Sequence, residues 1–252
     1  MRIILALLMM VVAAFPLRAE ESIVAGLSQN RVSITATFVG SEILIFGAVK
    51  REVAVPEGTL DVVVVVEGPG SEITVRKKDK RAGIWVNTES AQLRDVPSFY
   101  AVATSAPFSE IVPEAVDVAE GISVKNVIAL ADDAAQDDED FRDAVVRIRS
   151  NAGLYALNEG AVTMREATLF ETRVELPSNL TEGDYDARIY LMRGGEVVTQ
   201  YVAQIDVRKV GLERWLYWLA HQHALVYAFM SLAIAIGAGW GASTAFRMIL
   251  RS

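Results

Sequence analysis

Short runs of apolar and polar residues, separated by Gly and Pro turns, fill residues 22–105. In residues 31–38 every second position is apolar, which predicts a strand with one buried face. Residues 62–66 form an unbroken β-branched run, as expected of a central strand buried on both faces. The spacing predicts an antiparallel β-sandwich lobe of immunoglobulin-like type over residues 20–105. Further strands are expected at residues 42–49, 72–78, 83–87 and 99–103.

The pattern changes in residues 106–158. Phe141, Ala144, Val145 and Ile148 recur at helical spacing. Acidic residues precede them, where they complement the positive end of a helix dipole. We therefore expect a partly helical segment here.

Alternation returns in residues 159–210. The runs at 168–176, 185–191 and 197–207 predict strands, the last two joined by a Gly-Gly turn. So few strands rarely make an independent sandwich. Two arrangements remain open: these strands complete the first sandwich across a helical insertion, or they form a second β-rich lobe. The second arrangement is slightly favoured.

The first 19 residues have the features of a secretory signal. A basic residue, Arg2, precedes an apolar run over residues 3–15, and Ala19 supplies a small residue for cleavage. The run is short for a bilayer span. We expect residues 1–19 to be a signal peptide and the chain that follows to be exported.

A second apolar block, residues 224–246, contains no charged residue. Its 23 residues would form about 34 Å of helix, enough to cross a hydrocarbon core of about 30 Å. Arg247 and Arg251 follow in a short tail, residues 247–252, and positive charge favours the cytoplasmic side. The sequence thus predicts a single-pass inner-membrane protein with a periplasmic domain and a cytoplasmic C-terminus.

Residues 211–223, just before this span, are expected to form an interfacial helix. Trp215, Tyr217 and Trp218 suit the boundary between membrane and water. Within the span, small residues recur at every fourth position and therefore share one helix face. Such a face lets two transmembrane helices approach closely, which indicates a contact with this chain itself or with another membrane protein. The four helix-packing residues are Ala233, Gly237, Gly241 and Ala245.

Charge is distributed unevenly. The expected exported portion has 20 basic and 32 acidic residues, a net charge of −12, which makes nucleic acid an improbable partner. One cluster of basic residues departs from this background. It is either a solvated hairpin tip or a contact for an anion or a lipid headgroup. The cluster consists of Arg76, Lys77, Lys78, Lys80 and Arg81.

Groups suited to catalysis are scarce. The chain has no Cys, and its two histidines, His221 and His223, both lie beside the span. The β region therefore has no residues for a Ser-His-Asp, Cys-His or His-based zinc site. The acidic residues between positions 132 and 140 lack the spacing of a calcium-binding loop. We expect no catalytic residue, no cofactor, no metal and no enzymatic activity.

Several segments resemble an uncharacterised family of transmembrane proteins from alphaproteobacteria. The similarity extends over nearly all of the expected mature chain. The segments are residues 25–28, 31–34, 46–49, 83–87, 96–100, 176–177, 183–185 and 210–214. The resemblance implies no catalytic residue. Genes of that family often lie beside those of a sulfite-exporter-like permease, which implies a permease as a partner.

Three functions are compatible with these observations. The leading hypothesis is a non-enzymatic binding or accessory module, the partner of an inner-membrane exporter of small anions. The second is a structural envelope protein that associates with itself. The third and weakest is a periplasmic hydrolase that uses carboxylates.

Overall fold

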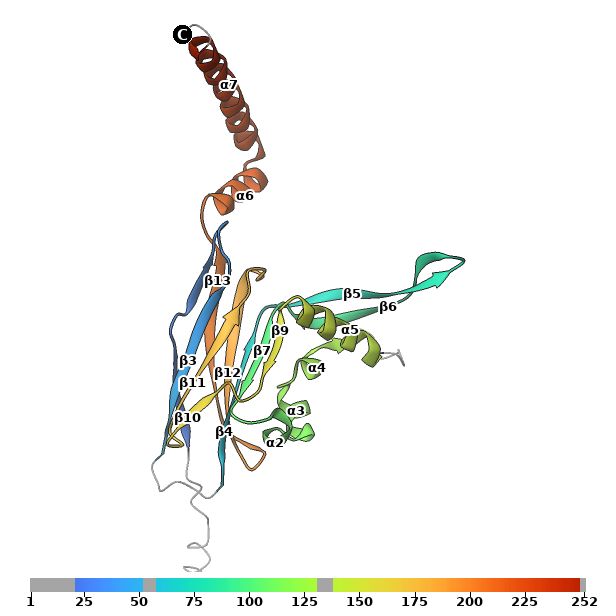
Figure 1. Ribbon diagram of the computed structural model, residues 1–252, viewed down its shortest axis with the longest axis vertical. Helices are drawn as coiled ribbons and strands as arrows, with labels where there is room; N and C mark the ends of the chain where they lie inside the picture. The colour runs from blue at the N-terminus through green and yellow to red at the C-terminus, as the bar shows by residue number, and fades with distance from the viewer. Residues whose placement is uncertain (1–20, 52–57, 131–137, 250–252) are drawn as a thin grey trace, which may run out of the picture. The chain divides into compact units, whose positions relative to one another are not determined.

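The computed structural model describes residues 21–51, 58–130 and 138–249 (Figure 1). The signal peptide expected at residues 1–19 and the end of the tail, residues 250–252, lie outside this part of the chain. Strands are the most abundant element of the described chain, and a long apolar helix stands near the C-terminus. The prediction of a mainly β protein with a C-terminal membrane helix is therefore confirmed, and its immunoglobulin-like detail stays a prediction.

A four-stranded antiparallel sheet has the order β1-β3-β11-β10. Alternate residues of β3, such as Ile43 and Ile45, are fully buried, and Phe170 and Val174 of β11 extend the same apolar face. The strands are β1 (Ser22–Leu27), β3 (Ser41–Lys50), β10 (Thr163–Arg165) and β11 (Leu169–Leu176).

A six-stranded sheet has the order β2-β13-β12-β4-β7-β9. The β-branched run at residues 62–66 lies in β4, between β12 and β7, and all five valines are fully buried. The prediction of a central strand buried on both faces is therefore confirmed. The strands are β2 (Arg31–Ile34), β4 (Leu60–Glu67), β7 (Tyr100–Thr104), β9 (Tyr155–Asn158), β12 (Gly183–Arg193) and β13 (Glu196–Lys209).

Strand pairing corrects the preference for two separate β-rich lobes. Strand β3 pairs with β11, and β4 pairs with β12, so both larger sheets contain strands from residues 20–105 and from residues 159–210. Neither set of strands could cover its own apolar faces, and pairing across the helical segment buries them together. The alternative that the sequence left open, one β unit with a helical insertion, is the one observed.

The expected strand over residues 31–38 is shorter than predicted. Strand β2 ends at Ile34, and Phe38 donates its backbone N–H to the carbonyl of Thr35 at 3.0 Å. This turn replaces the ladder hydrogen bonds, so the apolar alternation beyond Ile34 does not belong to a strand.

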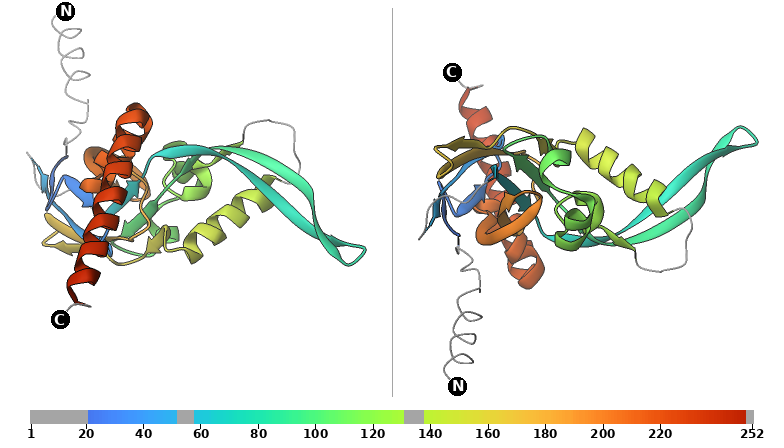
Figure 2. Two further views of the ribbon diagram at one scale, coloured as in Figure 1. Left: turned by 90° about the horizontal axis from the view of Figure 1, so that it is seen from above. Right: turned by 90° about the horizontal axis from the view of Figure 1, so that it is seen from below.

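A third, smaller sheet contains a long hairpin. The two short strands expected at residues 72–78 and 83–87 belong to one hairpin of β5 (Gly70–Arg81) and β6 (Ile84–Pro97), and β6 also pairs with the two-residue β8 (Ala129–Leu130). Figure 2 shows the hairpin extending away from the larger sheets, with α5 beside its base. Leu93 and Val96 are fully buried at this base.

The segment between the two sets of strands is partly helical, as predicted. It contains α2 (Phe108–Ile111), α3 (Glu114–Glu120), α4 (Val124–Val127) and α5 (Asp138–Asn151). The expected apolar stripe of α5 is only partly buried: Phe141 and Val145 enter the core, whereas Ile148 remains 60% exposed. These helices and the hairpin base cover one face of the six-stranded sheet. The core here includes Val63, Val65, Tyr100, Val102, Tyr190, Met192, Leu93, Val96, Ile122 and Val145.

Residues 32–38 and the described residues from 207 to 249 form a second compact unit. Val210 donates its backbone N–H to the carbonyl of Ile34 at 2.9 Å within it. The unit contains two helices, α6 (Leu212–Gln222) and α7 (Ala224–Ile249). In the described chain, one helix is long and apolar enough to cross a membrane, over Ala224–Thr244, and none of that stretch is buried.

Candidate binding pocket

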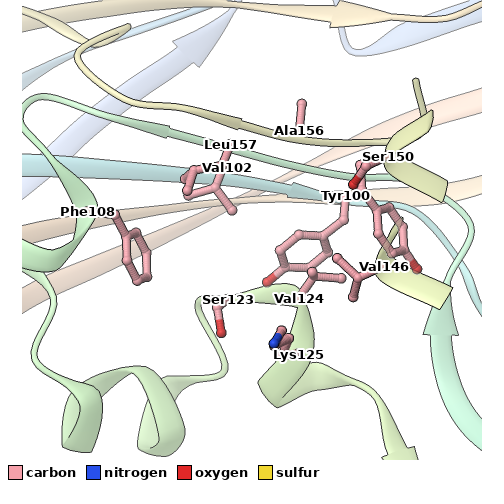
Figure 3. Close-up of a pocket in the computed structure, with 11 residues that line it drawn as sticks. Tyr100, Val102, Phe108, Ser123, Val124, Lys125, Val146, Ser150, Ala156 and Leu157 are labelled. Atoms are coloured by element: carbon pink, nitrogen blue, oxygen red, sulfur yellow. The ribbon is translucent and has the colours of Figure 1, made fainter. Parts of the chain in front are cut away.

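A pocket of about 270 Å³ opens between the six-stranded sheet and the helical segment (Figure 3). Parallel pairing of β7 with β9 sets Tyr100 beside Tyr155 and Val102 beside Leu157. The helices close the other side. The wall is mainly apolar, and its residues are Tyr100, Val102, Phe108, Ser123, Val124, Lys125, Val146, Ser150, Tyr155, Ala156 and Leu157.

Both phenol hydroxyls and the lysine of the pocket are already engaged by the protein. The Tyr100 hydroxyl donates to the carbonyl of Ile122 at 2.8 Å, and the Tyr155 hydroxyl donates to the carbonyl of Pro97 at 2.7 Å. The ammonium of Lys125 lies 2.5 Å from a carboxylate oxygen of Asp143. These contacts hold the polar atoms in place and leave mainly apolar wall to a ligand.

Burial keeps both phenols of the pocket neutral. It raises the pKa of Tyr155 to about 12, with Arg149 opposing the shift. Burial also raises the pKa of Tyr100, against the lowering effect of the Arg188 guanidinium. A phenol with so high a pKa stays protonated at neutral pH and is a poor general base. Neither phenol is therefore suited to act as a general base.

A part-buried network of hydrogen bonds fixes the position of the Tyr100 hydroxyl. Arg188 lies 2.8 Å from a carboxylate oxygen of Glu67 and donates to the hydroxyls of Tyr100 and Tyr190, each at 3.1 Å. It also donates to the backbone carbonyl of Gly121 at 3.2 Å. One guanidinium thus ties two strands of the sheet to the chain that leads from α3 to α4.

The ionisation of this network is set by burial and by its neighbouring charges. Burial raises the pKa of Glu67, although Arg188 opposes the shift. Burial alone would lower the pKa of Arg188, but Tyr100, Tyr190 and Glu67 together raise it. The cation is therefore retained, and its role is to fix the position of Tyr100 at the pocket wall.

A second buried ion cluster lies at the start of the described chain. The Glu21 carboxylate is 2.6 Å from Nε of Arg51 and 3.0 Å from Nη2 of Arg193. All three side chains are at least 85% shielded from solvent. The cluster connects the first residues of the β unit to the end of β12, which is a structural role.

Within the described residues, no group of three or more His, Cys, Asp or Glu side chains is arranged to hold a metal ion. The two histidines pack on aromatic rings. His221 stacks on Tyr217 with ring centroids 4.0 Å apart, and His223 meets Trp218 at 5.0 Å. These contacts give both imidazoles a structural role in the α6 region.

The predicted site residues occupy two other places. Arg76, Lys77, Lys78, Lys80 and Arg81 all lie exposed on β5 and do not line the pocket. Trp215, Tyr217 and Trp218 lie on α6 and are between 48 and 67% exposed, as interfacial side chains would be.

The small-residue face of α7 is open. A Cβ atom added at Gly237 or Gly241 would meet no atom within 4 Å, and Ala233 is exposed. The side chain of Ala245 lies outside the described part of the structure. The described part of this face is therefore free to receive another helix.

Sequence reasoning did not find the pocket or the Arg188 network. Tyr100 and Tyr155 are 55 residues apart, and only the parallel pairing of β7 with β9 brings them together. One available signal was Arg188, a charged residue in the middle of an apolar strand. In such a strand a charge is either on the solvent face or in a buried network.

The fold and these sites define a β-rich protein whose described residues include one candidate transmembrane helix. The family model described as "Putative transmembrane protein (Alph_Pro_TM)" matches residues 22–248, and the chain belongs to that family. The resemblance to a transmembrane family is therefore confirmed. Neither the curated proteins nor the solved structures that were compared include a match.

Proposed function

We propose that this protein is a non-enzymatic binding or accessory module, anchored in the inner membrane by α7 with its β unit in the periplasm. In this proposal the helix docks on another membrane protein, an exporter of small anions being the leading candidate. The β unit holds a small, mainly apolar ligand or ligand group in its pocket.

The proposal rests on the exposed apolar surface of α7. The stretch Ala224–Thr244 has no charge and no buried residue, so nothing in the described chain accounts for its apolar surface. A bilayer accounts for most of that surface. It does not account for the small residues at Ala233, Gly237 and Gly241, which expose little apolar area to lipid but permit close packing against a second helix.

The character of the pocket supports binding over catalysis. Burial disfavours ionisation of its phenols, its lysine is paired with Asp143, and its two phenol hydroxyls donate to backbone carbonyls. A chemical step would need a group placed to exchange a proton or attack a substrate. The wall instead offers shape and apolar area, which are the features of a ligand pocket.

Co-purification from native membranes tests the docking of α7. Gly237→Leu combined with Gly241→Leu should abolish recovery of the partner protein, because two large side chains would separate the helices. Gly239→Leu is the matched control, since residue 239 is about 200° around the helix from residue 237. Equal partner recovery from the double variant and from the unaltered chain would sink the proposal.

A self-associating structural protein is the second candidate, and the same open helix face favours it. A homodimer through α7 would use identical small residues on both helices. In the experiment above it would appear as recovery of a second, differently tagged copy of this chain and of nothing else.

A further inference from the structure

The distal half of the β5–β6 hairpin extends beyond the core as an exposed two-stranded ladder. The last half-buried residue of β5 is Val75, and every residue from Arg76 to Arg81 is exposed. The seven residue steps from Arg76 to Gly83 span about 23 Å at roughly 3.3 Å per residue. We call residues 76–87 the arm.

The arm is anchored at its base and paired to its tip, with one bulge between Lys77 and Lys78. Its base is held by Ile73 and Val75, which pack against the core, and by the fully buried Leu93 and Val96. Its strands remain paired out to the last residues, Arg81 opposite Ile84. The turn between them is two residues long, Ala82 and Gly83, both with positive φ, which is the conformation of a tight type I′ hairpin turn.

The tip combines positive charge with exposed apolar side chains. Trp85 is 68% exposed and lies opposite Lys80, so the two share one face of the ladder. Ile84 is 65% exposed and shares the other face with Arg81. Within residues 76–87 there are five basic residues and one acidic residue, Asp79.

This charge is opposite to that of the rest of the exported region. The expected exported portion, with the arm included, has a net charge of −12, so the basic tip selects for an anionic surface. Exposing Ile84 and Trp85 to water costs free energy, and neither side chain would contribute to binding an anion. Cationic side chains flanking Trp and an aliphatic residue are the composition of segments that lie in a membrane interface.

We propose that the arm docks on the surface of an anionic phospholipid bilayer. Ile84 and Trp85 enter the headgroup region, and the basic residues beside them contact lipid phosphates. Because the same chain carries a transmembrane helix, a bilayer is always present at high effective concentration. This inference goes beyond the proposed function and does not depend on what α7 binds.

A bilayer fits the tip better than a folded acidic protein does. Ile84 and Trp85 are on opposite faces of the ladder, so a protein would need a groove that encloses both faces. A headgroup layer surrounds the tip without any such shape. Each basic side chain held near an anionic membrane strengthens partitioning by about fivefold.

The chain contains no cysteine, so a single label can be placed without other changes. We would label Ile84→Cys in the full-length protein with an environment-sensitive fluorophore and reconstitute it in vesicles. One set of vesicles contains phosphatidylcholine alone, and the other contains added phosphatidylglycerol. Lipids with a shallow spin-label quencher are placed either in the vesicles that hold the protein or in added protein-free vesicles. Quenching in the first case indicates docking on the bilayer that α7 spans, and quenching in the second indicates docking on another bilayer.

The label at position 84 should be quenched, with a blue-shifted emission, when phosphatidylglycerol is present. A label at Glu72→Cys is the control, because Glu72 is 79% exposed at the base of the arm, and it should stay in water. Lys80→Gln combined with Arg81→Gln should reduce the ratio of docked to undocked arm by about 25-fold. Arg165→Gln combined with Arg173→Gln removes the same charge elsewhere and should change little.

Two results would overturn the proposal. One is a label at position 84 that stays exposed to water in the presence of anionic lipid, whether the quencher is in the protein's own vesicles or in the added ones. The other is equal quenching in neutral and anionic vesicles that is unaffected by the Lys80 and Arg81 changes. Thermal unfolding of each variant checks that the fold is intact, which is expected because the altered side chains are exposed.

Discussion

At the scale of single residues, two clusters bring shielded side chains of opposite charge together. Glu21 lies between Arg51 and Arg193, and Glu67 lies against Arg188. A buried pair contributes little net stability, but removing one partner leaves the other charge without compensation. The two clusters are therefore the places where a single polar substitution should matter most.

Glu21→Ala should lower the free energy of unfolding by about 3–5 kcal/mol, because it leaves two shielded guanidinium groups without a carboxylate. Denaturant unfolding of the purified protein measures the loss. Glu42→Ala is the control, since Glu42 pairs with Arg173 at 3.4 Å on the surface with both side chains more than half exposed. Its effect should stay below about 1 kcal/mol. A similar small loss for both variants would contradict the structural role of the Glu21 cluster.

Glu67 should make stability depend on pH. Burial raises its pKa, so the folded protein holds this proton more tightly than the unfolded chain does. The resulting stabilisation is fully present below the unfolded pKa, about 4.3, and is lost as pH rises through the raised folded pKa. Glu67→Gln does not titrate. The unfolding free energy of the unaltered protein minus that of the variant should therefore fall as pH rises above about 4, and a constant difference would contradict the shift.

The sequence alone could not reveal the Arg188 network, for a physical reason. In the strand around it, Arg188 and Tyr190 share one face and Ala187 and Ile189 the other. That pattern is the same whether the polar face meets water or a second layer of protein. Here α3, α4 and α5 cover it, and only the tertiary fold decides between the two cases.

At the scale of secondary-structure elements, local pattern predicted the strands well and their lengths less well. The buried valine run of β4 and the Gly-Gly turn between β12 and β13 were both predictable, because each depends on a few adjacent residues. Strand β2 stops early, because a hydrogen bond from Phe38 to Thr35 closes a turn. The hairpin of β5 and β6 continues without burial, so its exposed half gave only a weak apolar signal.

Helix α5 allows a direct comparison of pattern with packing. Val145 and Ile148 both belong to the apolar stripe in the sequence, yet Val145 is 4% exposed and Ile148 is 60% exposed. Val145→Ala should cost about 2 kcal/mol of stability through the cavity it leaves, whereas Ile148→Ala should cost less than about 0.5 kcal/mol. Thermal or denaturant unfolding of the two variants measures this, and equal costs would show that the stripe packs as a whole.

At the scale of the whole molecule, sequence reasoning identified the C-terminal apolar helix more securely than the arrangement of the strands. A charge-free apolar block is recognisable without any tertiary information, and the helix Ala224–Thr244 is present as expected. Whether the two sets of strands form one β unit or two depends on pairings between distant segments, such as β3 with β11. No local pattern records those pairings, and the pocket between β7, β9 and the helices depends on them too.

Site-specific photocrosslinking would show whether α7 contacts a partner inside the membrane. A benzophenone amino acid would replace Met230, seven residues from Gly237 and on the same helix face. The same group at Leu232, which lies about 140° around the helix from Gly237, is the control. In native membranes we expect position 230 to form an adduct between this chain and a different membrane protein. Position 232 should form little of that adduct. Equal adducts from both positions, or only a dimer of this chain, would contradict this expectation.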